Sequence, residues 1–308
     1  MSPVLILIER RSRINSVKKS VSSTAVGVCT LRAFLHDVNA INDPYAKHFI
    51  PPFYNYFLFI LRPLNWITGA PMYDMEKSGL QGMLYGRTLM GQDLIKKCVN
   101  KDKVKNIVLL GAGLDTKFHR CDIPENVELY EVDTEPTQKF KIEKLNKITG
   151  HKINQNIIYA PVDFETQNFM DVLKSKGFDP EEATLFLWEG VTYYLNPEAV
   201  QYTLRTISIN VKKAHVFLDF AREINEETLK LYFVKKLQDR VTKIGEPWKF
   251  GIEPENVEKY FSKYGFEIKT LLDWQEIRSR YQSFSNGELW EPKTCEIMNL
   301  AYIVNKSS

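Results

Sequence analysis

Apolar positions along the chain follow two different periods. Within residues 25–40 and 77–99 they recur at helical spacing, which predicts two helices. Further along, short apolar runs alternate with helical stretches, a pattern typical of parallel βαβ units with right-handed crossovers. The chain therefore divides into an N-terminal helical cap over 25–100 and an α/β core over 101–308, with a helical insertion at about 223–260.

The core contains five apolar runs that predict neighbouring strands of one sheet. They are Asn106–Leu110, Val127–Val132, Ile157–Val162, Thr184–Trp188 and His215–Phe220. Helices are expected between strands at 134–149 and 197–210, and an amphipathic helix is expected at 223–243. Two later runs, Phe266–Leu272 and Glu296–Val304, predict further strands. The fold class is thus α/β, with a Rossmann-like, doubly wound and mostly parallel sheet.

Two segments differ from the rest in composition. Residues 1–24 are basic and rich in serine, which predicts a flexible leader, with an organellar transit peptide as the alternative. The run 53–67, FYNYFLFILRPLNWI, predicts a core-facing helix of the cap. Its alternatives are a wall for an apolar substrate or a patch near a membrane. No run is long enough for a transmembrane helix.

Charge and cysteine spacing exclude several classes of protein. The net charge is +3 and basic residues are spread along the chain, so no nucleic-acid-binding surface is indicated. None of the four cysteines lies at the short spacing of a zinc or redox motif, and no HExxH segment occurs. No metal site is therefore expected. Unpaired thiols are typical of a reducing compartment, which predicts a cytoplasmic protein.

Two motifs at predicted strand ends indicate a bound nucleoside. The first strand ends in VLLGAGLDT, where Gly111 and Gly113 allow a tight turn and a close approach of the backbone to a ligand. A helix is expected to begin around Asp115 or Thr116. The second strand ends in YEVD, and Asp133 follows Gly113 by about 20 residues, the spacing at which an acid holds ribose hydroxyls.

The first of these loops favours a nucleoside without phosphates. In dinucleotide-binding proteins a third small residue, usually glycine, lets the helix N-terminus reach a pyrophosphate. Here that position is Thr116, which favours S-adenosylmethionine over NAD. A nicotinamide-dependent oxidoreductase is the alternative from another class of enzyme. A non-catalytic binding protein that retains the fold is a third interpretation.

The next two strand ends supply further candidate residues. The third strand ends in APVDFE, where Asp163 is placed to accept a hydrogen bond from the exocyclic adenine amine, with Phe164 beside the ring. The fourth strand runs into LWEGVTYYL, which places Glu189 at the edge where ligands bind in open α/β sheets. Tyr194 follows in a position to line the reaction site.

Several long segments, in this order, resemble the leucine carboxyl methyltransferase family, and more closely its branch of bacterial and polyketide O-methyltransferases. They are TLRAFLHDVNAINDPYA, GRTLMGQDL, VLLGAGLDTKFHR, YEVDTEPTQKFK, YAPVDFE and FLWEGVTYYL, spread over about residues 22–220. The resemblance implies a class I methyltransferase fold, with a seven-stranded sheet whose last strand is antiparallel. It also implies S-adenosylmethionine as the cofactor.

The same resemblance implies roles for individual residues. Arg32 and Arg87 would hold the methionine carboxylate. For Arg87 this agrees with its place on the apolar face of a predicted helix, where a guanidinium needs an anionic partner. The other contacts that the resemblance implies are Gly111 with the methionine part, Asp133 with the ribose, Asp163 and Phe164 with the adenine, and Glu189 with the methionine amine.

The expected reaction is an in-line transfer of the sulfonium methyl group to an acceptor oxygen, with the protein supplying position and desolvation. A carboxylate acceptor needs no general base, whereas a hydroxyl benefits from one, for which Tyr194 and His119 are candidates. Arg87 is a candidate for orienting an acceptor carboxylate. The expected acceptor is a small, apolar molecule that carries a carboxyl or hydroxyl group. A protein C-terminal carboxylate is the alternative.

Overall fold

The structure covers most of the chain and can test only the expectations that fall on the residues it describes. The computed structural model describes residues 23–37, 39–50, 79–149, 156–164, 167–243, 245–281, 283–285, 288–290 and 295–305. The aromatic run 53–67 and nearly all of the leader 1–24 lie outside these residues, so their roles stay predictions. Within the described residues, no helix combines the length and apolar character that crossing a membrane requires.

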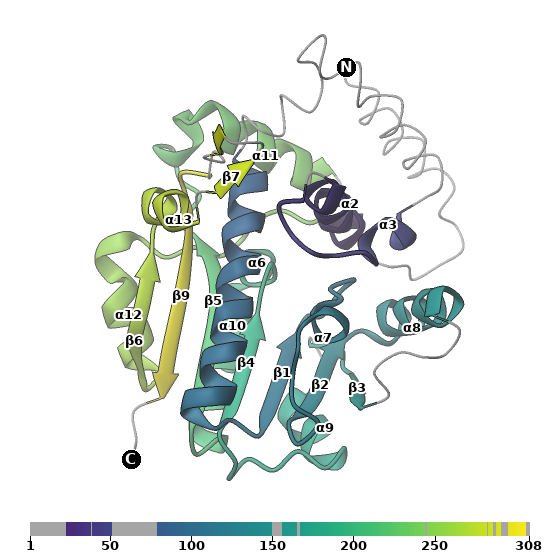
Figure 1. Ribbon diagram of the computed structural model, residues 1–308. Coiled ribbons are helices and arrows are strands. Elements are labelled where there is room, and N and C mark those ends of the chain that lie inside the picture. Colours follow the sequence, from purple (N-terminus) through teal and green to yellow (C-terminus); the bar gives the residue numbers. More distant parts are fainter. Residues whose placement is uncertain are drawn as a thin grey trace.

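The centre of the molecule is a seven-stranded sheet in the order β3-β2-β1-β4-β5-β9-β6 (Figure 1). Its strands are β1 (Asn106–Leu110), β2 (Glu128–Asp133), β3 (Ile157–Pro161), β4 (Thr184–Trp188), β5 (Ala214–Ala221), β6 (Phe266–Leu272) and β9 (Met298–Asn305). The first five pair in parallel, whereas β9 runs antiparallel to both β5 and β6. The expectation of a mostly parallel sheet with a reversed last strand is confirmed.

Helices cover both faces of the sheet, which explains why its central strands are apolar on both sides. In β1, Val108 and Leu110 face one core, together with residues of α9 (Phe169–Ser175), α10 (Pro197–Asn210) and α12 (Val257–Lys263). Ile107 and Leu109 face the other core.

The second core contains residues of α2 (Ser23–Asp37), α6 (Leu80–Lys97) and α13 (Trp274–Arg280). In Figure 1, α6 crosses this face of the sheet as a long continuous helix. The arrangement is the doubly wound layering that the alternation of strands and helices predicts.

The described helices agree with the predicted ones in the first part of the chain and depart from them later. The predicted crossovers correspond to α8 (Glu135–Thr149) and α10. The predicted helix 223–243 is wrong over its first half. A 3₁₀ turn η3 (Thr228–Lys230) comes first, and α11 (Tyr232–Lys243) is shorter than expected.

The physical reason for that difference is a local side-chain turn. The Asn225 side-chain oxygen accepts hydrogen bonds from the backbone N–H groups of Glu227 and Thr228, both at 3.0 Å. Such bonds compete with a helix for the same donors.

Several short elements escape the sequence pattern because they span only one or two turns or a few paired residues. They are α3 (Ala46–Phe49), α7 (Lys117–Arg120), α9, α12, α13, the 3₁₀ turns η2 (Thr192–Tyr194) and η4 (Pro254–Asn256), and the hairpin strands β7 (Ser283–Ser285) and β8 (Glu288–Trp290). Of these, α13 is the one whose start the sequence indicates. Its capping box joins Asp273 and Glu276, the D-x-x-E spacing that marks a helix start.

The described part of the N-terminal cap packs over the carboxyl ends of the first strands. Cys29 and Ala33 of α2 share an apolar cluster with Phe49 of α3, Leu145 of α8 and Leu114. Because Leu114 lies in the loop after β1, this cluster places α2 directly above the edge where ligands bind in such sheets. The division of the chain at residues 24 and 100 stays a prediction.

One buried ion pair links the sheet to α8. The Lys141 ammonium lies 2.8 and 2.7 Å from the two Glu131 carboxylate oxygens, and both side chains are excluded from solvent. Burial raises the pKa of Glu131, while Lys141 opposes that change. A buried pair of this kind is sensitive to the loss of one partner, because the other charge is then left without compensation.

We therefore expect Glu131→Leu to lower the free energy of unfolding by about 3–5 kcal/mol, since the Lys141 ammonium loses its partner. The double variant Glu131→Leu with Lys141→Met should recover most of that loss, because it leaves no unpaired charge. Urea unfolding of the three proteins measures both effects. A double variant as unstable as the single one would show that packing, not charge, decides stability at this position.

Candidate functional site

The loop after β1 makes the tight turn expected of Gly111 and Gly113. Their φ angles are +66° and +49°, a region that favours glycine. A Cβ atom at Gly111 would lie 2.5 Å from a methyl of Val191, so the loops after β1 and β4 touch. At Gly113 a Cβ atom would lie 3.6 Å from that of Ala25 in α2. The cap therefore closes over this loop.

The helix expected around Asp115 or Thr116 begins at Lys117 and is only four residues long. The Thr116 hydroxyl donates to Asp43 Oδ1 at 2.8 Å, so its side chain ties the loop to the cap. The long helix that presents its N-terminus to a pyrophosphate in dinucleotide-binding proteins does not follow this loop.

Asp133 ends β2 beside this loop. Its Oδ2 accepts from the Gly113 N–H at 2.6 Å, and its Oδ1 accepts from the Thr134 N–H at 2.7 Å. Burial raises the pKa of Asp133, although these two backbone bonds oppose the change. A carboxylate has about four lone-pair positions. The backbone bonds orient the group and leave acceptor capacity for hydroxyl donors.

Arg32 lies at the centre of a buried ionic cluster beneath the cap. Its Nε lies 2.9 Å from Asp43 Oδ2, its Nη1 lies 3.6 Å from Asp115 Oδ1, and its Nη2 donates to the Leu114 carbonyl. Burial opposes ionisation of Asp115, but the charges of Arg32 and Lys117 outweigh it and hold the pKa of Asp115 well below its usual range. Arg32 is thus held by protein carboxylates, next to the loop after β1.

Arg87 finds the anionic partner that its position on α6 requires. Its Nη1 donates to Asp219 Oδ2 at 2.6 Å and to the Tyr193 hydroxyl at 3.3 Å, while its Nε lies 3.9 Å from Glu189 Oε2. The other oxygen of Asp219 accepts from the Gly190 N–H at 2.6 Å. One carboxylate of β5 therefore fixes both Arg87 and the loop after β4.

Glu189 also forms an ion pair with Lys117 of α7. Burial raises the pKa of Glu189, and the ammonium of Lys117 opposes that change. The helix α6 passes this pair at a glycine. A Cβ atom at Gly91 would lie 2.7 Å from Lys117 Nζ and 2.9 Å from Glu189 Oε1. The close approach of α6 brings Arg87 and Glu189 to one place.

Asp163 and Phe164 follow β3, beside the end of β2. The Asp163 N–H donates to the Gln167 side chain at 2.9 Å, and the Phe164 ring lies 6.3 Å from that of Phe169. The Asp163 side chain is exposed, whereas Phe164 is half-buried. These two residues lie farther from the ionic clusters than Asp133 does, at the outer strand of the sheet.

Tyr194 lies in an aromatic group rather than beside a basic partner. Its ring centroid lies 4.7 Å from that of Tyr193 and 6.5 Å from that of Trp248. Burial raises the pKa of Tyr194 to about 12. The hydroxyl therefore keeps its proton at neutral pH, which argues against Tyr194 as a general base.

His119 has a different environment but a similar limitation. Burial lowers the pKa of His119 to about 4, so the neutral ring is only a weak base at physiological pH. The ring packs edge-on against Tyr45, with centroids 6.2 Å apart. Tyr45 directly precedes α3, so His119 packs against the cap.

Five site residues are absent from the sequence prediction. They are Asp43, Asp115, Lys117, Asp219 and Arg120, whose Nη2 lies 3.2 Å from Asp115 Oδ1. Of these, Asp219 was detectable, because it is the one acid in the apolar run VFLDFA and a buried carboxylate needs a partner as much as Arg87 does. The others lie in loops or in a one-turn helix, where the sequence pattern does not predict burial.

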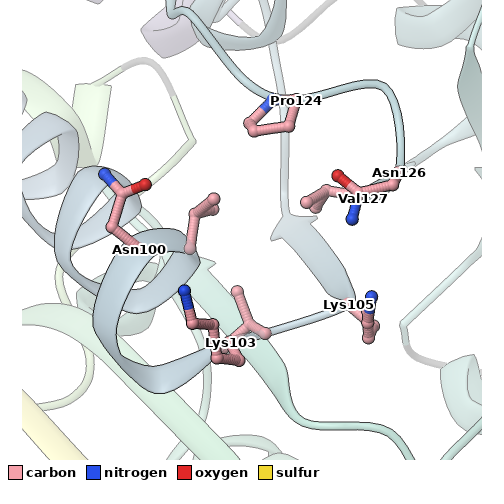
Figure 2. A pocket seen from close by; sticks show the side chains of 8 residues that line it. Asn100, Lys103, Lys105, Pro124, Asn126 and Val127 are labelled. Atoms are coloured by element: carbon pink, nitrogen blue, oxygen red, sulfur yellow. The ribbon is translucent and has the colours of Figure 1, made fainter.

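A cavity of 210 Å³ lies at the opposite end of β1 and β2. Figure 2 shows six of its lining residues, Asn100, Lys103, Lys105, Pro124, Asn126 and Val127. Binding sites for drug-sized ligands usually enclose at least about 300 Å³. This cavity is smaller, and it brings together none of the residues that the sequence predicts for the cofactor.

Comparison with known protein structures identifies the fold. A methyltransferase structure from Thermobifida fusca, named provisionally as such, superposes with a TM-score of 0.57 over 94% of this chain and 96% of that one, at 13% identity. At this identity the likeness concerns the fold alone, which is that of the class I methyltransferases.

Two curated relatives carry S-adenosyl-L-methionine-dependent methyltransferase as a provisional name. The protein from Streptomyces avermitilis is 31% identical over 195 residues, covering 61% of this chain and 64% of the relative. The protein from Mycolicibacterium smegmatis is 29% identical over 192 residues, covering 61% and 63%. Each alignment thus spans somewhat less than two thirds of the relative.

One protein family matches the part of the chain that carries the motifs. The sequence model of the leucine carboxyl methyltransferase family matches residues 25–208, from α2 through α10. That range is more than half of the chain, and it contains every residue that the sequence predicts for the cofactor site. This chain belongs to the leucine carboxyl methyltransferase family.

Proposed function

We propose that this protein is an S-adenosylmethionine-dependent methyltransferase. The observation that carries the proposal is the meeting of Gly111, Gly113 and Asp133 at the switch point of the sheet, next to buried arginines. The family and the provisional names of its relatives support the same cofactor.

The charge of the site fits this cofactor. Four cations, Arg32, Arg87, Lys117 and Arg120, lie among the carboxylates of Asp43, Asp115, Asp133, Glu189 and Asp219. Leaving aside the exposed Asp163, four cations against five carboxylates give the buried part of the site a net charge of −1. S-adenosylmethionine, with a carboxylate, an ammonium and a sulfonium, carries +1. The pyrophosphate of NAD adds negative charge to a negative site, so the oxidoreductase alternative is disfavoured.

The residues present have defined tasks in binding. Asp133 would accept hydrogen bonds from the ribose hydroxyls, and Asp163 with Phe164 would hold the adenine. Arg32 and Arg87 would attract the methionine carboxylate, and Glu189 would attract the methionine amine. Gly111 and Gly113 would let the backbone approach the ligand. When bound, the cofactor supplies an activated methyl group, so the protein mainly positions the acceptor and excludes water.

The acceptor group is best matched by a carboxylate. Neither residue proposed as a base is suited to that task, since Tyr194 retains its proton and the lowered pKa of His119 makes it a weak base. A carboxylate acceptor is already anionic and needs no base. We therefore propose carboxyl O-methylation of a small, apolar acid, with the C-terminal carboxylate of a protein as the second candidate. The apolar group around Trp248, next to Tyr193 and Arg87, supports the small acid.

Asp133→Ala should weaken binding of S-adenosylmethionine and S-adenosylhomocysteine by about 10- to 100-fold, since each bond to a charged acceptor contributes about 1.5–3 kcal/mol. Calorimetric titration measures this effect, with NADH as the competing ligand class. Glu135→Gln is the matched control, because Glu135 is exposed and, among the described residues, forms an ion pair only with Lys139, at 2.7 Å. Equal binding by wild type and Asp133→Ala would contradict the assigned role.

The same residue gives a pH dependence. Because the folded-state pKa of Asp133 is raised, the carboxylate is present above that pKa and is lost as pH falls through it. Affinity for the cofactor should therefore decline on the acid side in the wild type. Asp133→Asn removes this ionisation, so its remaining slope should be shallower and should reflect Glu189, whose pKa burial also raises.

Gly190→Ala tests whether the loop after β4 positions Arg87. A Cβ atom there would lie 2.9 Å from Arg87 Nη1, and the φ of +74° adds backbone strain. Gly177→Ala is the matched control, since Gly177 has φ +96° and no atom within 4 Å of an added Cβ. Each variant should lose about 1–2 kcal/mol of stability from strain. Only Gly190→Ala should also bind the cofactor about tenfold less tightly, a cost of about 1.4 kcal/mol.

Carboxyl methylation has a chemical signature that separates it from hydroxyl methylation. Methyl esters release methanol in mild alkali, whereas methyl ethers do not. With labelled cofactor and a panel of apolar carboxylic and hydroxylic acids, we expect the transferred label to become volatile after alkali treatment. Label that stays with the product would exclude the carboxylate and require a base that this site does not provide through Tyr194.

A further inference from the structure

A second polar cluster lies toward the other end of β5, away from the candidate cofactor site. One donor atom each of Cys98, Asp102 and His215 lie within 4.8 Å of one another. His215 precedes Asp219 by four residues of the strand, a separation of about 13 Å. Cys98 is fully buried, and His215 is 3% exposed. Neither the family site nor the proposed methyl transfer uses these residues.

The backbone holds two of these side chains in place. At its end, α6 widens into a π-helical turn η1 (Cys98–Asp102), and the N–H groups of Lys103 and Val104 both donate to the Cys98 carbonyl. Lys103 closes the turn in the left-handed region, at φ 57°. Such π turns are rare and occur frequently at functional sites. This turn brings the Cys98 and Asp102 side chains to the same place.

Two polar atoms of the cluster are buried without a hydrogen bond. Within the described residues, neither His215 Nε2 nor Asp102 Oδ2 has a partner. The other ring nitrogen, Nδ1 of His215, lies 2.6 Å from the Tyr302 hydroxyl, which is 3.8 Å from Cys98 Sγ. Leaving a carboxylate oxygen and an imidazole nitrogen unpaired inside a protein is costly. A bound group that satisfies both atoms would remove that cost.

We propose that Cys98, Asp102 and His215 form a zinc site. Thiolate, carboxylate and imidazole are the three donor types that zinc takes in proteins. The charges of one thiolate and one carboxylate balance Zn²⁺, so the buried site becomes neutral. The Tyr302 hydroxyl borders the same space and supplies a fourth donor or a partner that orients the imidazole ring.

The geometry requires only a small adjustment. Zinc bonds of about 2.0–2.3 Å in a tetrahedral shell place the donor atoms about 3.3–3.8 Å apart. The cluster must therefore contract by about 1 Å, which side-chain rotation in Cys98 and Asp102 provides.

The ammonium groups of two lysines lie close to the cluster and oppose the binding of a cation. Lys97 Nζ lies 4.4 Å from the Tyr302 ring centroid, and Lys213 Nζ donates to the Asp102 carbonyl at 3.4 Å. Both lysines are exposed to solvent, which screens their charges.

A redox role for Cys98 fits the structure less well. Reactive thiols are at least partly exposed, and Cys98 has no exposed surface. Its position instead suits a structural metal. The ion would join the end of α6, which carries Arg87, to β5, which carries Asp219. The sequence expectation of no metal site rested on short spacings, and His215 lies far from Cys98 along the chain.

Cobalt titration of the purified full-length protein, stripped of metal with a chelator, tests the proposal. Co²⁺ takes the same ligands as zinc and reports thiolate coordination through charge-transfer absorption in the near ultraviolet. We expect that band to saturate at one Co²⁺ per chain and to disappear on addition of Zn²⁺. Absence of the band, or a stoichiometry other than one, would overturn the proposal.

Variants assign the ligands and separate binding from folding. Cys98→Ser should abolish the cobalt band, while Cys121→Ser, at a half-buried cysteine outside the cluster, should keep it. Asp102→Asn and His215→Gln should each raise the Zn²⁺ dissociation constant at least tenfold, since each loses a ligand. Asp102 is only half-buried, so its variant keeps the test open if the others fail to fold. A band that persists in Cys98→Ser, or Zn²⁺ affinity unchanged in Asp102→Asn, would exclude the site.

Discussion

The carboxylate of Asp219, inside a fully buried strand, holds together the parts of the candidate site that come from different elements. One of its oxygens binds the guanidinium of Arg87 on α6, and the other binds the N–H of Gly190 in the loop after β4. Without Asp219, the buried guanidinium of Arg87 would keep only the weaker contact with Glu189 at 3.9 Å, and the loop at Gly190 would lose its anchor. The position of the loop in turn limits the space above Gly111, because Val191 packs against that glycine.

Several charged side chains are buried around Asp219, and nearly all of them need an oppositely charged partner. Arg32, Arg87 and Lys117 are all buried, and each lies within ion-pair distance of at least one carboxylate. Inside a protein such networks stabilise a unique arrangement when every member is satisfied and are costly when one is not. The site is therefore preorganised before a ligand binds, and small shifts at its edges, as at Gly190, should be transmitted to Arg87.

The two ends of the sheet carry different polar clusters. The carboxyl ends of β1, β2 and β4 carry the glycine turns and acids of the candidate cofactor site, covered by α2. At the other end, the π turn after α6 meets β5 and β9 through His215 and Tyr302. The same helix and the same strand thus contribute to both clusters. A metal at the second end would stabilise the packing on which Arg87 and Asp219 depend.

The sequence by itself determined the parallel sheet, the edge at which a ligand is expected and the choice of Gly111, Gly113 and Asp133 as the first candidates for that site. These depend on periodicity and short spacing, which lie along the chain and can be read from it. It also determined that Arg87 needs an anion, but not that Asp219 is that anion. Only the tertiary structure decided the pairings of Arg32, Arg87, Glu189 and Lys117, and the meeting of Cys98 with His215. Those contacts join residues far apart in sequence, and their free energy depends on burial and distance, which no local pattern encodes.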